Sequence, residues 1–185
     1  MRIVAGKLKG LKLNTFEYGN IRPTLDSVRE SIFNKIQFGI SGANFLDLFA
    51  GTGVFSIEAY SRGASVIYAC DVNINSIKLI NTNIKKAKID NQINVLNKDY
   101  IDSIKFLADK NIKFDYVFLD PPFESDFGNK AINKICENGL MYSDGVIIYE
   151  HALSTKVEIP SNFEVFNEKK YGTIMVSYIK VKNND

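Results

Sequence analysis

Residues that form disulfides and metal sites are scarce in this 185-residue chain, which has two cysteines and one histidine. Two cysteines cannot supply a disulfide framework, and no cysteine or histidine pairs stand at the spacing of a metal site. Cys70 closes an apolar run and Cys136 lies in a helical pattern, so both are predicted to be core residues. His151 alone excludes a multi-histidine metal site, and we expect a hydrogen-bonded structural residue rather than a general base.

Long hydrophobic runs are also missing. No apolar stretch approaches the ~20 residues that cross a bilayer, and Met1 does not begin a signal-peptide pattern. Hydrophobic residues still make up 45% of the chain, which is enough to build a core. The length corresponds to about one domain of roughly 150 residues. We therefore expect one domain over residues 1–185 of a cytoplasmic, monomeric protein with no membrane partner.

Charge is small overall but unevenly distributed. The formal net charge is +2, yet residues 1–35 carry seven Lys or Arg against three acids, and the remaining residues carry 16 against 18. This asymmetry indicates a basic N-terminal extension, residues 1–40, on a nearly neutral body, as in a catalytic domain that meets a polyanion. The alternative is a solvated lysine-rich surface. Arg2, Lys7 and Lys9 are the predicted contacts with that polyanionic substrate in this extension.

Apolar runs and helical patterns alternate from residue 45 onward. Five candidate strands are continuously apolar: Phe45–Phe49, Ser65–Ala69, Ile93–Leu96, Phe114–Leu119 and Val146–Tyr149. Helical stretches separate them: Val54–Arg62, Asn73–Lys88, Tyr100–Ala108 and Phe127–Asn138. Apolar strands separated by helices are typical of a parallel sheet covered on both faces. The predicted class is α/β, doubly wound and Rossmann-like, with a catalytic core over residues 41–185.

Both ends of the chain depart from this alternation. Ile3–Ala5 and Leu11–Leu13 are predicted to be short strands of a β-hairpin, followed by a helix that Thr24 or Ser27 would cap. At the other end, strands are expected over 162–167 and 173–181. Five residues between them are too few for a helical crossover, so this pair should be an antiparallel hairpin inserted into a seven-stranded sheet.

A glycine loop at residues 47–53 follows the first strand of the core and precedes a helix. Gly51 and Gly53 allow a sharp turn and close approach of a ligand to the backbone. A dinucleotide fingerprint requires a third glycine where this chain has Ser56. Asp47 would also repel a pyrophosphate, so both residues disfavour an NAD-dependent oxidoreductase. A tight turn with no ligand is the simpler alternative.

Acidic residues follow three consecutive strands and should meet at one edge of the sheet. Asp71, twenty residues after Gly51, is placed to accept hydrogen bonds from ribose hydroxyls, and Asp99 to meet an adenine amine. Helix capping is the alternative role for such acids. An adenosine with an amino-acid tail, S-adenosylmethionine, fits better than a nucleotide. The predicted donor-binding residues are Asp47, Phe49, Ala50, Gly51, Thr52, Gly53, Asp71, Asp99 and Tyr100.

The segment Asp120-Pro121-Pro122-Phe123 follows the fourth strand and is the predicted catalytic loop. Two prolines stiffen it and remove two N–H donors, which leaves carbonyls and one carboxylate facing the site. Asp120 and the Pro121 carbonyl could each accept one N–H of a nucleobase amine, and Phe123 offers a stacking face. Neither cysteine is placed for the nucleophilic attack that carbon methylation of pyrimidines needs.

The motifs together resemble the RsmD family of 16S ribosomal RNA guanine-N2 methyltransferases. The likeness lies in Arg22-Pro23-Thr24 with Asp26, Arg29 and Glu30, in the segments 46–53 and 61–64 with Glu58, and in residues 120–123. It implies a class I methyltransferase fold, S-adenosylmethionine as donor with S-adenosylhomocysteine as product, and no metal. It further implies a guanine of 16S rRNA, at position 966, in a small subunit or its assembly intermediate. Arg22, Thr24 and Arg29 are implied substrate contacts.

Two other activities remain open for the same loops. The acceptor loop suits any planar amine, so an adenine amine in nucleic acid or a protein glutamine amide are alternative substrates. A non-catalytic RNA-binding or assembly factor on this fold is a further alternative, although the Asp120 loop would then have no purpose.

Overall fold

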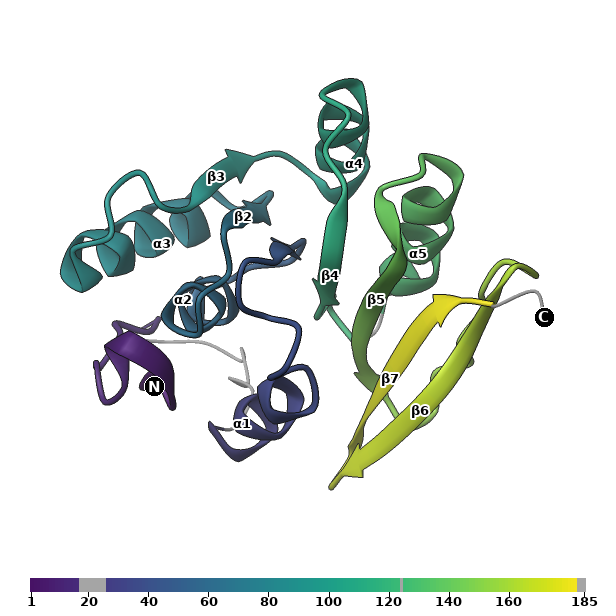
Figure 1. Ribbon diagram of the computed structural model, residues 1–185, viewed down its shortest axis with the longest axis horizontal. Coiled ribbons are helices and arrows are strands. Elements are labelled where there is room, and N and C mark those ends of the chain that lie inside the picture. Colours follow the sequence, from purple (N-terminus) through teal and green to yellow (C-terminus); the bar gives the residue numbers. More distant parts are fainter. Residues whose placement is uncertain (17–25, 124, 183–185) are drawn as a thin grey trace.

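A seven-stranded sheet organises the computed structural model, which describes residues 1–16, 26–123 and 125–182. The strand order is β3-β2-β1-β4-β5-β7-β6 (Figure 1). The strands are β1 (Asn44–Asp47), β2 (Val66–Asp71), β3 (Asn94–Asn97), β4 (Phe114–Leu119), β5 (Met141–Ala152), β6 (Phe163–Tyr171) and β7 (Ile174–Val181). The helices are α1 (Asp26–Lys35), α2 (Val54–Ser61), α3 (Ile74–Ala87), α4 (Tyr100–Asp109) and α5 (Phe127–Glu137), with a short 3-10 helix η1 (Gly6–Leu8).

The first five strands in this order are parallel, which confirms the α/β prediction. Asp47 at the end of β1 pairs in register with Ala69 of β2 and Phe118 of β4. Asp71 ends β2 beside Asn97 of β3. Because all these strands run the same way, the residues that follow them lie along one edge of the sheet, where ligands bind in open α/β folds.

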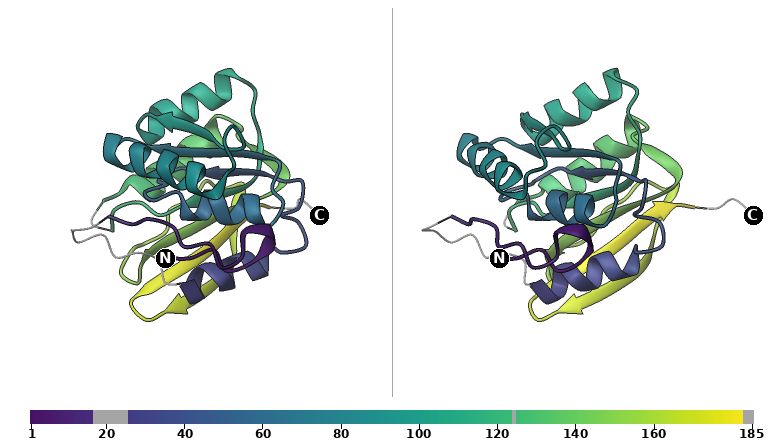
Figure 2. Two further views of the ribbon diagram at one scale, coloured as in Figure 1. Left: turned by 90° about the vertical axis from the view of Figure 1, so that its left-hand side faces the viewer. Right: turned by 60° about the vertical axis from the view of Figure 1, so that its left-hand side comes forward.

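Helices cover both faces of the sheet, as the apolar strands predict. Side chains of α1, α2 and α3 pack with Phe45 and Phe118 in one buried cluster. Those of α4 and α5 pack with Leu46 and Val117 in a second cluster. Successive residues of β1 and β4 thus point to opposite faces. Figures 1 and 2 show α4 and α5 together on one side of the sheet and the other three helices on the opposite side.

The C-terminal hairpin is antiparallel and enters the sheet, as predicted, with β7 between β5 and β6. Its turn is tighter than expected because β6 continues to Tyr171 and only Gly172 and Thr173 connect the strands. Gly172 has a φ of 60°, a conformation that glycine adopts without steric cost. The charged run 168–170 therefore belongs to an edge strand, where lysines are common.

The predicted N-terminal β-hairpin is formed only in part. A single bridge joins Arg2 and Lys12, and η1 occupies the bend between them. The N–H of Ile3 donates to the Leu11 carbonyl at 2.9 Å and that of Leu13 to the Met1 carbonyl at 3.1 Å, but the pairing stays short because the next N–H groups turn to α2. The backbone N–H groups of Val4 and Ala5 donate to the Glu58 carboxylate, at 2.8 and 3.0 Å. Residues 1–14 are called the N-terminal arm below.

The predicted cap of the first helix is also corrected. Ser27 lies inside α1, after Asp26, so it is not the N-cap. Thr24, the alternative cap, lies outside the described residues. Val28, Ile32 and other side chains on the same face of α1 are buried, as the periodicity predicts.

The cysteine and histidine predictions agree with the structure. Cys70 is buried, and Cys136 is half-buried against the second core cluster. His151 is buried, with its ring nitrogens 2.9 Å from the Ala152 carbonyl and 2.8 Å from the Ser177 hydroxyl. Within the described ranges, no helix is long and apolar enough to cross a membrane.

Candidate active site

The glycine loop between β1 and α2 has the left-handed backbone that its sequence predicts. Gly51 has a φ of 53° and Gly53 of 77°. A side chain on Gly53 would also meet Ile80 of α3, because a Cβ there would lie 3.1 Å from its Cγ1. At Gly51, by contrast, no atom of the described residues lies within 4 Å of that position. Space is therefore open beside Gly51 at the edge of the sheet.

Asp47 lies at the floor of this loop and is almost completely buried. Its Oδ2 accepts hydrogen bonds from the Ser56 hydroxyl at 2.8 Å and from the Ser56 backbone N–H at 3.2 Å. Ser56, which the sequence analysis used only as evidence against a dinucleotide site, is thus the hydrogen-bond partner of Asp47. The carboxylate also faces the first turn of α2, where the helix dipole favours negative charge.

Three carboxylates converge on this floor. Burial raises the pKa of Asp47 to about 7, hydrogen bonds from Ser56 oppose the rise, and the charges of Asp120 and Asp71 add to it. Such charge effects require short separations, so the ends of β1, β2 and β4 bring their acids within electrostatic reach of one another. A site with this much negative charge favours a cationic ligand.

Asp71 holds the glycine loop from the neighbouring strand. Its Oδ2 accepts the backbone N–H of Gly51 at 2.8 Å, and its Oδ1 accepts that of Asn73, also at 2.8 Å. Asp99 is exposed and caps α4, accepting the N–H of Asp102 at 2.9 Å. The helix-capping role that was the alternative for these acids is therefore present at Asp99.

The proline loop follows β4 beside the glycine loop. Asp120 is half-buried, Pro121 is buried, and Phe123 is 43% exposed. The prediction for Pro122 needs correction, because its carbonyl accepts both the N–H and the hydroxyl of Ser125, at 3.0 and 2.6 Å. Pro122 therefore shapes the loop, and its carbonyl is occupied rather than facing the site.

An aromatic group connects the two loops, and one member was missed from the sequence. The Tyr100 ring lies 5.6 Å from that of Phe49 and 5.3 Å from that of Phe127, between ring centroids. Phe127 begins α5 directly after the proline loop and is 41% exposed. The sequence could have identified Phe127, because it lies only four residues after Phe123 of the predicted catalytic loop.

The N-terminal arm is joined to the glycine loop through Asn83 of α3, which the sequence analysis did not identify. The Asn83 amide donates to the Thr52 carbonyl at 2.9 Å and to the Asn14 carbonyl at 3.2 Å. Its oxygen accepts the Asn14 N–H at 2.8 Å. Thr52 also donates a hydrogen bond to the sulfur of Met1. The first residue of the arm therefore contacts the glycine loop directly, and the last is linked to it through Asn83.

The prediction that Arg29 contacts the substrate needs correction. Its side chain is completely buried, with one nitrogen 2.9 Å from Asp26 and another 3.7 Å from Glu58. It also donates to the Arg2 carbonyl. In this structure Arg29 has no surface with which to touch a substrate. Its place beside Glu58 shows that it fixes the arm and α1 together.

The other predicted substrate contacts are on the surface or outside the described residues. Arg2 is exposed and lies 3.5 Å from Asp26. Lys7 is exposed over the Tyr60 ring, and Lys9 is exposed at the bend of the arm. Arg22 and Thr24 lie in the segment 17–25, outside the described residues.

Comparison with known proteins places the chain among bacterial relatives. A family model described as "Conserved hypothetical protein 95" matches residues 1–180. The "Ribosomal RNA small subunit methyltransferase D" of Haemophilus influenzae is 32% identical over 184 residues, covering 99% of this chain and 94% of the relative.

Solved structures agree with this assignment. "Putative methyltransferase yhhF from Escherichia coli" superposes with a TM-score of 0.86 at 29% identity, covering 98% of each chain. A structure described as "a putative methyltransferase complexed with SAH" has a TM-score of 0.68 at 18% identity, covering 83% of this chain and 49% of that one, and shares the fold. The fold is therefore Rossmann-like, of the class I methyltransferase type, and the chain belongs to the Conserved hypothetical protein 95, or RsmD, family.

Proposed function

We propose that this protein transfers a methyl group from S-adenosylmethionine to the N2 amine of a guanine in 16S rRNA. The observation that carries the proposal is the convergence of Asp47, Asp71 and Asp120 beside the open glycine loop. The name of the Haemophilus influenzae relative supports methylation of small-subunit rRNA. Guanine N2 at position 966, in a small subunit or its assembly intermediate, is the finer form of the proposal.

The residues of the glycine loop fit the donor. S-adenosylmethionine carries a sulfonium and an ammonium, and when bound it supplies an electrophilic methyl group. Asp47 provides negative charge under the loop, and the open space at Gly51 leaves the backbone accessible to the adenosyl group. Asp71, Asp99 and Tyr100 remain the proposed contacts of the ribose and adenine. No metal is required by this chemistry.

The proline loop would hold the acceptor amine. Its nitrogen is a poor nucleophile because the lone pair is delocalised into the base. Asp120 and the Pro121 carbonyl each accept one N–H, which directs the lone pair toward the methyl carbon and stabilises the positive charge that develops on nitrogen. Methyl transfer breaks the sulfur–methyl bond and leaves S-adenosylhomocysteine. The amine proton then passes to water, because alkylation has made it acidic, so Asp120 acts mainly through its charge. Phe123 stacks on the flipped-out base.

The direct test is methyl transfer to its substrate. S-adenosylmethionine with a labelled methyl group is incubated with the protein and with small ribosomal subunits from cells that lack this protein. We propose that the protein acts as a monomer of one domain. We expect label in 16S rRNA, and mass spectrometry of the nucleosides should identify N2-methylguanosine. Label in methyladenosine or in a protein glutamine would select one of the alternative substrates, and no label in any fraction would contradict the proposal.

Donor affinity should rise with pH through about 7. In the free protein Asp47 is half protonated near that pH, since its pKa is about 7. A bound cation favours the ionised carboxylate, so binding releases a proton below this pKa. We expect up to about tenfold weaker binding at pH 6 than at pH 8. Calorimetry in buffers of different ionisation enthalpy measures both the donor affinity and the number of protons released on binding. Asp47→Asn should remove the pH dependence.

The exposed cations of the arm should contribute to RNA affinity. Replacing Arg2→Glu, Lys7→Glu and Lys9→Glu together should weaken binding and lower the slope of log Kd against log salt by about 2. The control carries the same charge change on α4 and the loop after it, at Lys105, Lys110 and Lys113. If both triple variants bind alike, the arm is only a solvated lysine-rich face.

A further inference from the structure

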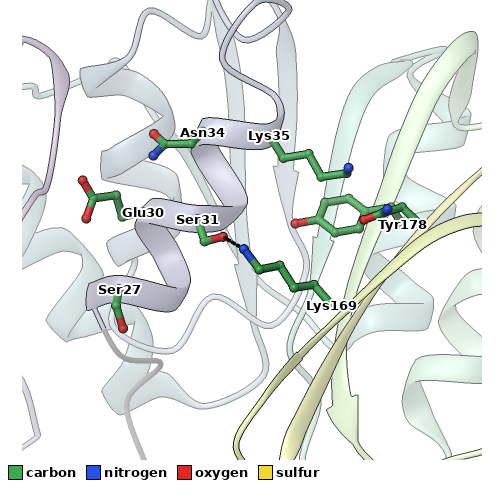
Figure 3. Close-up of a pocket in the computed structure, with 8 residues that line it drawn as sticks. Ser27, Glu30, Ser31, Asn34, Lys35, Lys169 and Tyr178 are labelled. Carbon is green, nitrogen blue, oxygen red and sulfur yellow. Dashed lines mark hydrogen bonds between the residues drawn. The ribbon is translucent and has the colours of Figure 1, made fainter.

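A surface groove lies away from the two loops, between α1 and the β6–β7 hairpin. The structure has a groove there of about 550 Å³, called the hairpin groove below (Figure 3). Its walls come from both elements and are mainly polar: Ser31, Asn34, Lys35, Asn167, Lys169 and Tyr178. Neither the proposed donor site nor the acceptor loop contributes a residue to it.

Two ammonium groups from opposite walls point into the hairpin groove. Lys35 of α1 reaches toward the hairpin, with its Nζ 5.1 Å from the centroid of the buried Tyr178 ring (Figure 3). Lys169 of β6 reaches toward α1 and lies 3.0 Å from the Ser31 hydroxyl. Ser31 is also 2.5 Å from the Tyr171 hydroxyl. The ammonium of Lys169 is thus held by neutral groups.

Neither ammonium is neutralised within the described part of the chain. The ion pairs found there involve other residues, and none includes Lys35 or Lys169. Among the residues that the structure describes, Glu30 is the one acid that lines the groove, and its carboxylate points to the side of α1 away from Lys169 (Figure 3). Two cations close to a polar hollow attract an anion.

One end of the groove lies close to the arm that we propose binds RNA. Ser27, at one end of the groove, follows Asp26, which pairs with Arg2 of the arm. On the hairpin side, Tyr171 at the end of β6 pairs with Ile174 of β7. Ile174 also pairs with Ala152 at the carboxyl end of β5. The groove therefore runs beside the edge of the sheet on which the acceptor loop stands.

We propose that the hairpin groove binds the phosphate backbone of the substrate RNA beside the methylated nucleotide. This inference rests on the proposed function. Lysine is a compact charge on a flexible stem and neutralises phosphates without the fixed geometry of arginine, which suits contact with a backbone rather than with a base. Asn34 and Asn167 provide further donors for phosphate or ribose oxygens.

The test compares two double variants with the same loss of charge. Lys35→Gln with Lys169→Gln changes the groove. Lys105→Gln with Lys110→Gln changes α4 and the residue that follows it, on the other face of the sheet. Binding to 16S rRNA transcribed in vitro is measured from 50 to 200 mM salt. We expect the groove variant to lower the salt slope by about 1.4, so that the wild type loses about sevenfold more affinity than the variant over this range. The control should keep the wild-type slope.

Separate readouts distinguish this inference from the proposed function. Affinity for S-adenosylmethionine and the thermal midpoint of unfolding should be the same in the groove variant and the wild type. Bound RNA should also protect Lys35 and Lys169 of the wild type from acetylation. If the wild type methylates RNA while groove and control variants share one slope, the groove inference is overturned and the function stands. Loss of binding to assembled subunits only, with naked RNA unaffected, would point to a ribosomal protein and also overturn it.

Discussion

Replacing Asp120 by alanine is expected to lower kcat for methyl transfer by about 10²–10³-fold while donor binding persists. This is the loss observed when one group that stabilises developing charge is removed from an active site. Asp120 is half-buried at the end of β4, and its charge acts on Asp47 beneath the glycine loop. Its removal takes away the proposed acceptor for one N–H and leaves the donor-binding residues in place.

A second measurement on the same variant tests the geometry independently of turnover. The negative charge of Asp120 helps to raise the pKa of Asp47. In Asp120→Ala the midpoint of pH-dependent donor binding should therefore move to lower pH. Asp109→Ala, which removes an exposed acid from the end of α4, is the matched control and should leave kcat and the midpoint unchanged. Wild-type turnover in Asp120→Ala would contradict the role of the acceptor loop.

The parallel part of the fold was predictable because its signals are local. Continuous apolar strands and helical periodicity place β1 to β4 and α2 to α5 within a few residues of their observed bounds. Once strands are known to be parallel, residues after each strand share one edge, so Asp47, Asp71 and Asp120 could be grouped from the sequence alone. Gly51 and Gly53 were predictable for the same reason, since a tight turn restricts the backbone at the glycine itself.

The remaining features depend on partners far apart in the sequence. Arg29 is positively charged and belongs to a motif that predicted substrate contact. In the structure it is buried instead, because it pairs with the buried Glu58, 29 residues later in the chain. Asn83 contacts Asn14 and Thr52 across 69 and 31 residues. In the hairpin groove, Lys169 donates a hydrogen bond to Ser31, 138 residues earlier in the chain. No local pattern encodes these pairs, and each needs the folded coordinates.

Glu58 shows how such distant contacts hold the N-terminal arm. Its carboxylate is completely buried and lies 2.8 Å from the Arg62 guanidinium and 3.7 Å from that of Arg29. It also accepts the N–H groups of Val4 and Ala5 from the arm. Nε and Nη1 of Arg29 have no hydrogen bond in the described part of the chain, so the charge of Glu58 is important for compensating this buried cation.

Replacing Glu58 by glutamine is therefore expected to lower the free energy of unfolding by about 3–5 kcal/mol. The variant keeps the size of the side chain but leaves two buried guanidinium groups without their shared carboxylate. Urea denaturation measures the loss. Limited proteolysis should show faster cleavage within residues 1–14, because two of the hydrogen bonds that fasten the arm to α2 then have a neutral acceptor.

Charge compensation can be separated from simple disruption by a double-mutant cycle with Arg29→Met. Glu58→Gln leaves the buried Arg29 cation without this carboxylate, whereas the double variant removes that cation as well, so the cost of the double variant should be smaller than the sum of the two single costs. The exposed pair of Lys134 and Glu137 provides the control, where Glu137→Gln should cost at most about 1 kcal/mol. Additive losses would mean that Glu58 and Arg29 stabilise the fold independently. In that case the arm is held by its backbone hydrogen bonds, and the buried charges do not act as one network.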